Sequence, residues 1–125
     1  MLNLCGALLM QGDLESAHEA ALEAWPHALQ HGAMGYMLDY VTLLAARIGR
    51  HAEAAQMLGR ADAWLAANHN TREPNEARTA RLGRALIEAA IEPVESARLF
   101  AAGGHLTDAQ TDALVQSVLA QQIAM

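Results

Sequence analysis

The sequence predicts an all-α protein made of antiparallel helical hairpins that stack on one another, closed by a helical cap at the C-terminus. Apolar residues make up 53% of the 125-residue chain but aromatic residues only 4%, and alanine dominates the apolar share. This composition favours helices that approach one another closely. Apolar positions also recur every three or four residues, which is the spacing of a helix with one buried face. A chain of this length forms one domain, residues 1–125, with one modest core.

The first hairpin is predicted over residues 1–32. A short apolar helix comes first, the chain turns at Gly12, and a second helix opens with Asp13. Pro26 removes a backbone donor and its ring collides with the carbonyl near Leu22, so we expect a kink or an early end there. A last bent turn then closes at Gly32 in a left-handed conformation. The contact stripe of the second helix is Ala17, Ala21, Ala24 and Ala28.

The second hairpin is predicted over residues 33–70, and it repeats the first after about 37 residues. Its first helix runs from Met34 to Ile48 with the strongest periodic signal in the chain, and it stops at Gly49. The stripe of its second helix is Ala54, Leu58, Ala61 and Leu65. Subtracting about 37 from these positions gives the four alanines of the first hairpin, which indicates that the two hairpins are copies of one structural repeat.

Residues 73–125 are predicted to form the helical cap, which brings the expected total to seven helices and no strand. Pro74 suits a first helical turn, and this helix should run to about Ile91. A short helix over 94–102 should end at Gly103 and Gly104, and Thr107 should cap a last helix with Gln110 three residues later. The expected contact positions are Leu82, Ala85, Leu86, Ala89 and Ala90 in the first of these helices, and Leu114, Val118 and Leu119 in the last.

Charge and cysteine content narrow the class of partner. Fourteen acidic residues against eight basic ones give a net charge of −6, which disfavours direct binding to nucleic acids or to anionic membranes. Cys5 is the only cysteine, so an internal disulfide is impossible and a reducing cytoplasm is the expected location. The apolar opening stretch is too short for a membrane span and lacks the basic start of a signal peptide.

The hairpins resemble the tetratricopeptide repeat, a 34-residue helical hairpin whose copies stack into a right-handed superhelix. The paired alanines Ala17 and Ala24, with Ala54 and Ala61, match the second helix of that motif, and Leu4 and Val41 match a leucine of its first helix. The sequence departs from the motif in its longer period and in having aliphatic or small residues at the aromatic positions expected in the first helix. The resemblance implies a short superhelix that presents a concave surface.

The C-terminal part resembles the closing segment of bacterial signal-transduction ATPase transcriptional regulators of the LuxR-type or winged-helix kind. The resembling features are Pro74, Arg78 with Arg81, Phe100, and the capped helix 107–120. This implies the repeat region of such a regulator, or a fragment of one. No nucleotide-binding glycine loop and no DNA-reading module occurs in the sequence, so those activities do not carry over to this chain.

Six residues are candidates for partner binding. Met34 and Met37 could line an adaptable apolar groove, with Tyr36 and Tyr40 as exposed aromatic neighbours, although their helical spacing equally fits a core. Arg78 and Arg81 belong to a basic stripe that could grip a phosphate or an acidic peptide. The alternative for this stripe is a solvated face neutralised by Glu73, Glu76 and Glu88, with a pair between Arg84 and Glu88.

No residue is predicted to be catalytic, to bind a cofactor or to bind a metal. His27 and His31 have a four-residue metal-ligand spacing but are read as helix-end histidines, and Cys5 is read as a core residue. The sequence therefore favours a non-catalytic scaffold that binds a protein, a peptide or other domains of its own polypeptide. A homodimer through the exposed side of the first helix would use the same kind of surface. The alternative is a small-molecule sensor with an apolar pocket between helices.

Overall fold

The computed structural model describes the backbone of residues 2–121 and the side chains of residues 4–121. Within these residues every regular element is a helix, which confirms the all-α prediction and the seven expected helices. They are α1 (Leu2–Gln11), α2 (Leu14–Gln30), α3 (Met34–Arg47), α4 (His51–Ala67), α5 (Pro74–Ala90), α6 (Pro93–Gly104) and α7 (Asp108–Leu119).

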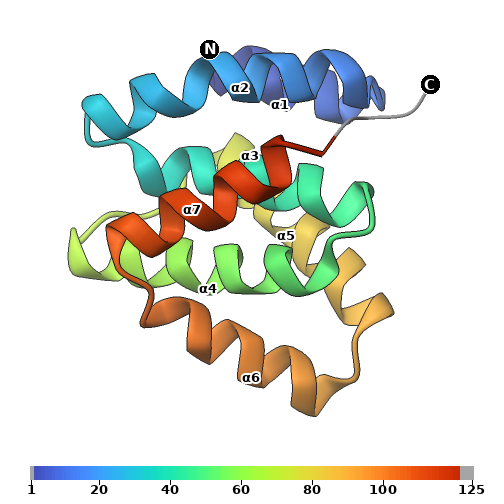
Figure 1. Ribbon diagram of the computed structural model, residues 1–125, viewed down its shortest axis with the longest axis vertical. Helices are drawn as coiled ribbons and strands as arrows, with labels where there is room; N and C mark the ends of the chain where they lie inside the picture. The colour runs from blue at the N-terminus through green and yellow to red at the C-terminus, as the bar shows by residue number, and fades with distance from the viewer. Residues whose placement is uncertain (1, 122–125) are drawn as a thin grey trace.

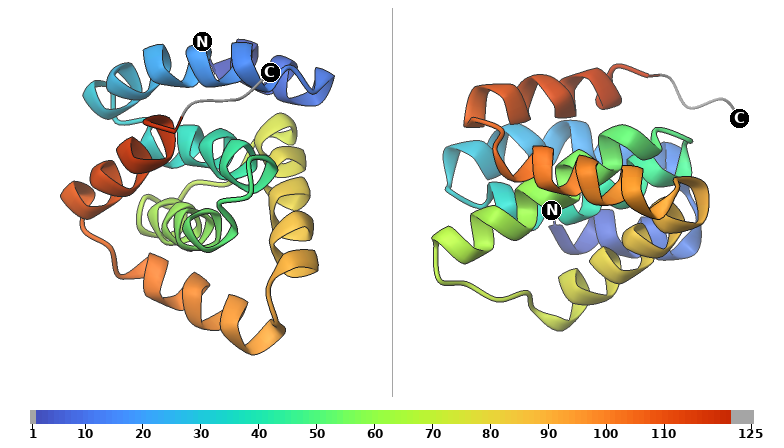
Figure 2. Two further views of the ribbon diagram at one scale, coloured as in Figure 1. Left: turned by 45° about the vertical axis from the view of Figure 1, so that its right-hand side comes forward. Right: turned by 90° about the horizontal axis from the view of Figure 1, so that it is seen from below.

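Helix α4 lies at the centre of the molecule, where it packs against α3, α5, α6 and α7 (Figure 1, Figure 2). Helix α3 contacts both α1 and α5, so these three odd-numbered helices lie side by side. Helix α2 packs on α1 and α3, and α7 bridges α2 and α4. One side of the molecule is therefore built from α1, α3 and α5.

Both predicted hairpin turns are present, with the conformation that their glycines allow. Gly12 has a φ of 78° and Gly49 a φ of 89°, values that residues with a Cβ rarely adopt. Asp13 caps α2 by accepting a hydrogen bond from the backbone amide of Ser16 at 3.1 Å. The contact stripes are buried as expected, at Ala17, Ala21, Ala24 and Ala28 in α2 and at Ala54, Leu58, Ala61 and Leu65 in α4.

Helix α2 does not end early at Pro26 but continues to Gln30. The residue before the proline explains why the helix persists. Trp25 is buried, and its indole Nε1 donates a hydrogen bond to Asp112 of α7 at 2.8 Å. Tertiary packing of this kind outweighs the backbone bond that a proline removes. Gly32 follows with a φ of 68°, the left-handed conformation expected there.

Helix α6 ends at Gly104, so Gly103 and Gly104 belong to its last turn and do not follow it as expected. Gly103 serves the crossing of α6 with α4, because a Cβ built on it would overlap the backbone carbonyl of Gln56. Gly59 of α4 faces the backbone of Phe100 in the same way. The two glycines let the backbones of α4 and α6 approach more closely than side chains would permit.

Helix α5 buries a different face from the one its leucines predicted. Its buried residues are Glu76, Thr79, Ala80, Gly83 and Ile87. The expected contact positions Leu82, Ala85, Leu86, Ala89 and Ala90 are all exposed. The prediction was wrong because α5 packs against α3 through small residues, with Gly83 beside Thr42 and Leu43. An apolar stripe of α5 is consequently left on the surface.

The predicted cap of α7 is confirmed in detail. The Thr107 hydroxyl accepts a hydrogen bond from the Gln110 amide at 3.1 Å, and the Gln110 side chain accepts one from the Thr107 amide at 2.9 Å. This reciprocal pair is a capping box. Val118 and Leu119 are buried as expected, so the cap orients α7 with this face toward the core.

Candidate interaction surface

Tyr40 lies in the core and is only 1% exposed, so the expectation that it is exposed was wrong. Its hydroxyl donates a hydrogen bond to Oε2 of Glu76 in α5 at 2.6 Å. Burial raises the pKa of Tyr40, and the Glu76 carboxylate raises it further. The phenol therefore stays protonated, and it supplies the donor that a buried carboxylate needs. Tyr40 acts as a link between α3 and α5.

The two candidate methionines also belong to the core. Met34 and Met37 are both buried, so they take the core role that their spacing allowed and offer no accessible groove. Tyr36 is half-buried, with its ring edge-on to Trp64 of α4 at 5.6 Å between centroids. Trp64 lies directly over Gly35, where a Cβ would overlap the indole ring. These aromatic contacts hold α3 and α4 together.

The surface left open by this packing is the side built from α1, α3 and α5, which we call the docking face. It consists of Leu4, Ala7 and Met10 from α1, Arg47 from α3, and Arg78, Arg81, Leu82, Ala85 and Leu86 from α5, all of which are exposed. At 100° per residue, the five positions of α5 fall on one side of that helix. The docking face thus combines aliphatic side chains with arginines.

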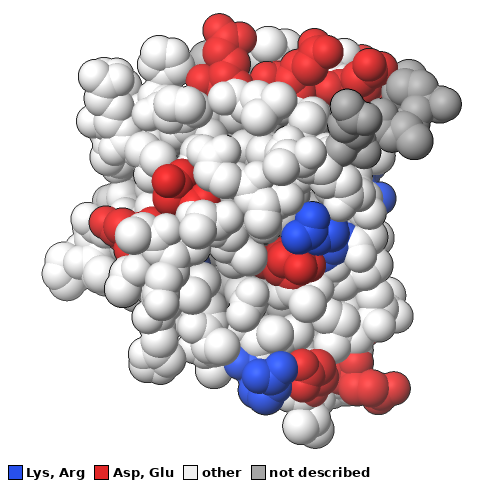
Figure 3. Space-filling model, viewed as in Figure 1, with Lys and Arg blue, Asp and Glu red and all other residues white. Residues whose placement is uncertain are grey.

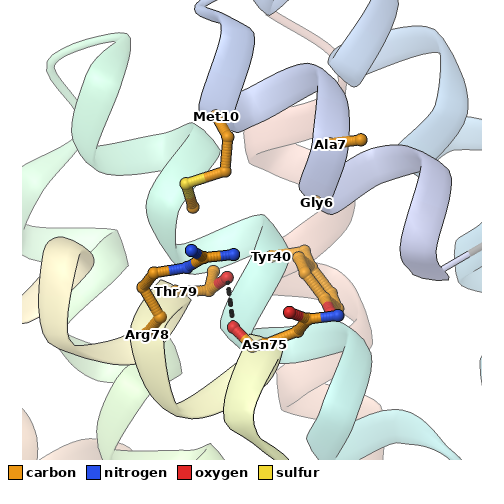
Figure 4. Close-up of a pocket in the computed structure, with 7 residues that line it drawn as sticks. All are labelled: Gly6, Ala7, Met10, Tyr40, Asn75, Arg78 and Thr79. Carbon is orange, nitrogen blue, oxygen red and sulfur yellow. Dashed lines mark hydrogen bonds between the residues drawn. The ribbon is translucent and has the colours of Figure 1, made fainter.

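A cavity of about 140 Å³ hollows the docking face where α1 and α5 flank α3. Met10 of α1 and Arg78 of α5 point toward one another across it, and Tyr40 of α3 lies to one side of them, next to Gly6 (Figure 4). Asn75 and Thr79 complete the α5 side, where the Thr79 hydroxyl donates to the Asn75 carbonyl at 2.8 Å. The hollow has an apolar wall on α1 and a polar wall on α5.

A second, larger hollow of about 440 Å³ lies further along α3 and α5. Its lining is Ala46, Arg47, Leu82, Ala85 and Leu86. Only one of these side chains is charged, so this part of the docking face is mainly aliphatic. Exposed aliphatic side chains that gather in a hollow are typical of a surface that another protein covers.

The arginines of the docking face have no acidic partner among the described residues. The five other arginines form ion pairs, which join Arg50 to Glu53, Arg60 to Asp108, Arg72 to Asp39 and Asp62, Arg84 to Asp62, and Arg98 to Glu95. The expected neutralisation by Glu76 fails because that carboxylate is buried against Tyr40. Arg84 pairs with Asp62 instead of Glu88, and its guanidinium lies over the Phe100 ring.

Asp39, Arg72 and Asp62 form a partly buried network that fixes the loop between α4 and α5. Arg72 donates to both oxygens of Asp39, at 2.8 and 3.0 Å, and pairs with Asp62 at 2.7 Å. Burial raises the pKa of Asp39 to about 6, while Arg72 opposes this shift. Perturbed carboxyls often mark active sites. Here the Asp39 side chain is closed to solvent, so the network ties elements together.

The remaining candidates for chemistry also have structural roles. Burial raises the pKa of the Cys5 thiol to about 12, so the nucleophilic thiolate is disfavoured. The rings of His27 and His31 lie nearly parallel, with centroids 6.5 Å apart. Among the residues for which side chains are described, no group of three or more His, Cys, Asp or Glu could hold a metal ion.

Comparison with known proteins gives no assignment. No family model matches the chain, and neither a curated protein nor a solved structure matches it. In the described part of the chain, no helix is long and apolar enough to cross a membrane. The docking face is therefore the feature on which a functional argument rests.

Sequence reasoning identified two of the surface residues and missed others. Arg78 and Arg81 were candidates and are exposed on the docking face, whereas Arg47, Leu82 and Leu86 were not candidates. A signal for the leucines was present, because Ala80 and Gly83 are spaced for close helix contact on another side of the same helix. Helix α5 therefore has two faces that could be buried, one with small residues and one with leucines.

Proposed function

We propose that this chain is a non-catalytic protein–protein interaction scaffold that binds its partner through the docking face. The observation that carries the proposal is the exposed set of Leu82, Leu86 and Met10 beside arginines that lack an acidic partner in the described residues. Methionine and arginine are enriched at protein interfaces, and the centre of an interface is more apolar than the rest of the protein surface.

The same proposal includes a short right-handed superhelix of the tetratricopeptide type, with residues 73–125 as its cap. Support comes from the lateral contacts of α1 with α3 and of α3 with α5, since stacked repeats of this kind present an extended concave surface. Residues 14–30 and 51–67 supply the second helices, with alanine stripes buried in both. In this arrangement the docking face is the concave side.

We further propose that the chain serves as the C-terminal repeat region of a bacterial transcriptional regulator, or as a fragment of one. The proline-started α5, the arginines after it and the capped α7 support this assignment. Reading the genomic DNA upstream of the Met1 codon tests it. An ATPase module in the same reading frame is expected, and a stop codon immediately upstream would refute it.

The small-molecule sensor is less well supported. That function needs an enclosed pocket lined by the methionines, yet Met34, Met37 and Met57 are buried as part of the core cluster. The cavity beside Tyr40 measures about 140 Å³, below the several hundred Å³ typical of ligand pockets. The hollow of about 440 Å³ is large enough, but four of its five lining residues are exposed on the surface and none is a methionine, so it is not the enclosed pocket that a sensor needs.

Position-specific photo-crosslinking in cells tests the scaffold. A photoreactive phenylalanine analogue replaces Leu86 on the docking face, and in a matched variant it replaces Val94, which is 84% exposed on α6. We expect one protein to crosslink at Leu86 and not at Val94, and then to bind the purified chain with an affinity that Arg78→Glu lowers. Equal crosslinking at both positions, or binding unaffected by Arg78→Glu, would exclude the docking face as the binding site.

A further inference from the structure

A second surface of this chain, on α2, carries negatively charged side chains, whereas the charged side chains of the docking face are arginines. On α2, Glu15, Glu19 and Glu23 are exposed, and none has a basic partner among the described residues. Leu22 and Leu29 are exposed beside them, at 44% and 38%. At 100° per residue these five side chains fall on one side of the helix. We call them the acidic ridge, and acidic side chains gather along the α2 edge in Figure 3.

We propose that the acidic ridge of one copy of this chain docks on the docking face of a second copy. This inference rests on the proposed function, because it names the partner of the same surface. The unpaired arginines Arg47, Arg78 and Arg81 would meet unpaired glutamates, and exposed leucines would meet exposed leucines. Complementary charge across an interface fixes register and excludes other partners.

The order of residues along the two helices supports a parallel alignment. In α2 the glutamates Glu15 and Glu19 come first, and Leu22, Glu23 and Leu29 follow in that order. In α5 the arginines come first and Leu82 and Leu86 follow. With the helices parallel, Glu15 and Glu19 lie toward Arg78 and Arg81, and Leu22 lies toward Leu82 and Leu86. Glu23 then lies toward Arg47, which lines the hollow beside Leu86. An antiparallel alignment would place Glu15 and Glu19 against the leucines of α5.

The lengths of the two surfaces also agree. Glu15 and Glu23 are eight residues apart, as are Arg78 and Leu86, and this separation is about 12 Å at the rise of an α-helix. Arg47 lines the hollow of Leu82 and Leu86, so it extends the basic part of the docking face toward Glu23 of the docked ridge. One helix of the second copy would therefore cover both hollows of the docking face.

Because the acidic ridge and the docking face are different surfaces, the contact is heterologous. A copy that is bound through its ridge still has its docking face free for another copy. Such contacts close into rings or continue as filaments. We therefore expect the mass measured by sedimentation velocity to rise with concentration from the 13.4 kDa of one chain to more than twice that value. A sample that stays at one chain mass up to about 1 mM, where even the weakest specific contacts populate, would overturn the proposal.

Charge reversal identifies the surfaces. The variants R78E/R81E and E19R/E23R alter only exposed side chains, and each should weaken association about tenfold or more, because attraction becomes repulsion at two positions. An equimolar mixture of the two variants should associate again, since the reversed ridge now matches the reversed face. Arg98→Glu on α6 is the control and should associate like the unaltered chain.

Circular dichroism of each variant establishes that it remains helical before its mass is interpreted. Association that persists in both double variants places the interface elsewhere and refutes the proposal. If both double variants lose association and their mixture does not recover it, the acidic ridge does not pair with the docking face. A monomeric chain that still crosslinks another protein at Leu86 would refute self-association while leaving the scaffold function standing, so the two failures are distinguishable.

Discussion

At the scale of single residues, Tyr40 and Glu76 depend on each other because both are closed to water. The carboxylate is 8% exposed and the tyrosine 1%, and the hydroxyl donates to the carboxylate at 2.6 Å. Two polar groups that would each destabilise the core alone are tolerated together. The pair also decides which face of α5 is buried, since Glu76 must point at α3.

Tyr40→Phe is therefore expected to lower the free energy of unfolding by about 1–3 kcal/mol, the cost of leaving a buried acceptor without its donor. Urea unfolding followed by circular dichroism measures it. Tyr36→Phe on the same helix is the control, because the Tyr36 side chain is half-buried, and its effect should stay within about 0.5 kcal/mol. Equal losses in the two variants would mean that the Glu76 bond contributes nothing specific.

At the scale of elements, the crossing of α4 and α6 depends on two glycines. Gly59 and Gly103 each face the backbone of the opposite helix, so the contact is backbone against backbone. Leu99 of α6 is buried at the same interface side. The two glycines therefore let α6 cross α4 closely, because no side chain separates the two backbones at these positions.

Gly103→Ala is expected to destabilise the protein by about 1–3 kcal/mol or more, because the added methyl group meets backbone atoms that cannot move aside. Gly104→Ala is the matched control. A Cβ at Gly104 has its nearest neighbours at 3.8 Å, an ordinary contact, and alanine is the better helix former. Thermal unfolding of both variants should show a lower Tm only for Gly103→Ala. A similar drop for both would argue against the close crossing.

The elements also show what the sequence could predict. The alanine stripes of α2 and α4, the turns at Gly12 and Gly49 and the cap at Thr107 follow from patterns within a few residues. The buried face of α5 does not, because it depends on contacts with α3, namely Gly83 beside Thr42 and Leu43 and the hydrogen bond from Tyr40, 36 residues from Glu76 in sequence. Leu82 and Leu86 were therefore predicted in the core although they lie on the surface.

The candidate site was predictable to a smaller extent for the same reason. Arg78 and Arg81 are polar residues near the start of a helix, and their exposure follows from the local pattern. The role of Arg47 depends on α5 lying beside the end of α3, which no local pattern contains. The burial of Tyr40 depends on both α1 and α5, since its ring also lies against Gly6.

At the scale of the whole molecule, α7 connects the two hairpins. It receives the Trp25 hydrogen bond from α2 through Asp112, and from α4 the Arg60 side chain reaches Thr111 and Asp108 at 3.2 and 2.7 Å. The buried apolar residues form one cluster that runs from Cys5 to Leu119. A repeat array without such a bridge can unfold one hairpin at a time.

We therefore expect the two hairpins to unfold together, and the two tryptophans allow a direct measurement. Trp64→Phe leaves Trp25 as the only tryptophan, which reports on α2 and α7 with the bond to Asp112 intact. Trp25→Phe leaves Trp64, which reports on α3 and α4 after that bond has been removed. Within each variant, the urea transition by fluorescence should coincide with that by circular dichroism, as a two-state process requires. If Trp25 fluorescence changes at a lower urea concentration than the helical signal, the first hairpin separates before the rest, and α7 does not couple them.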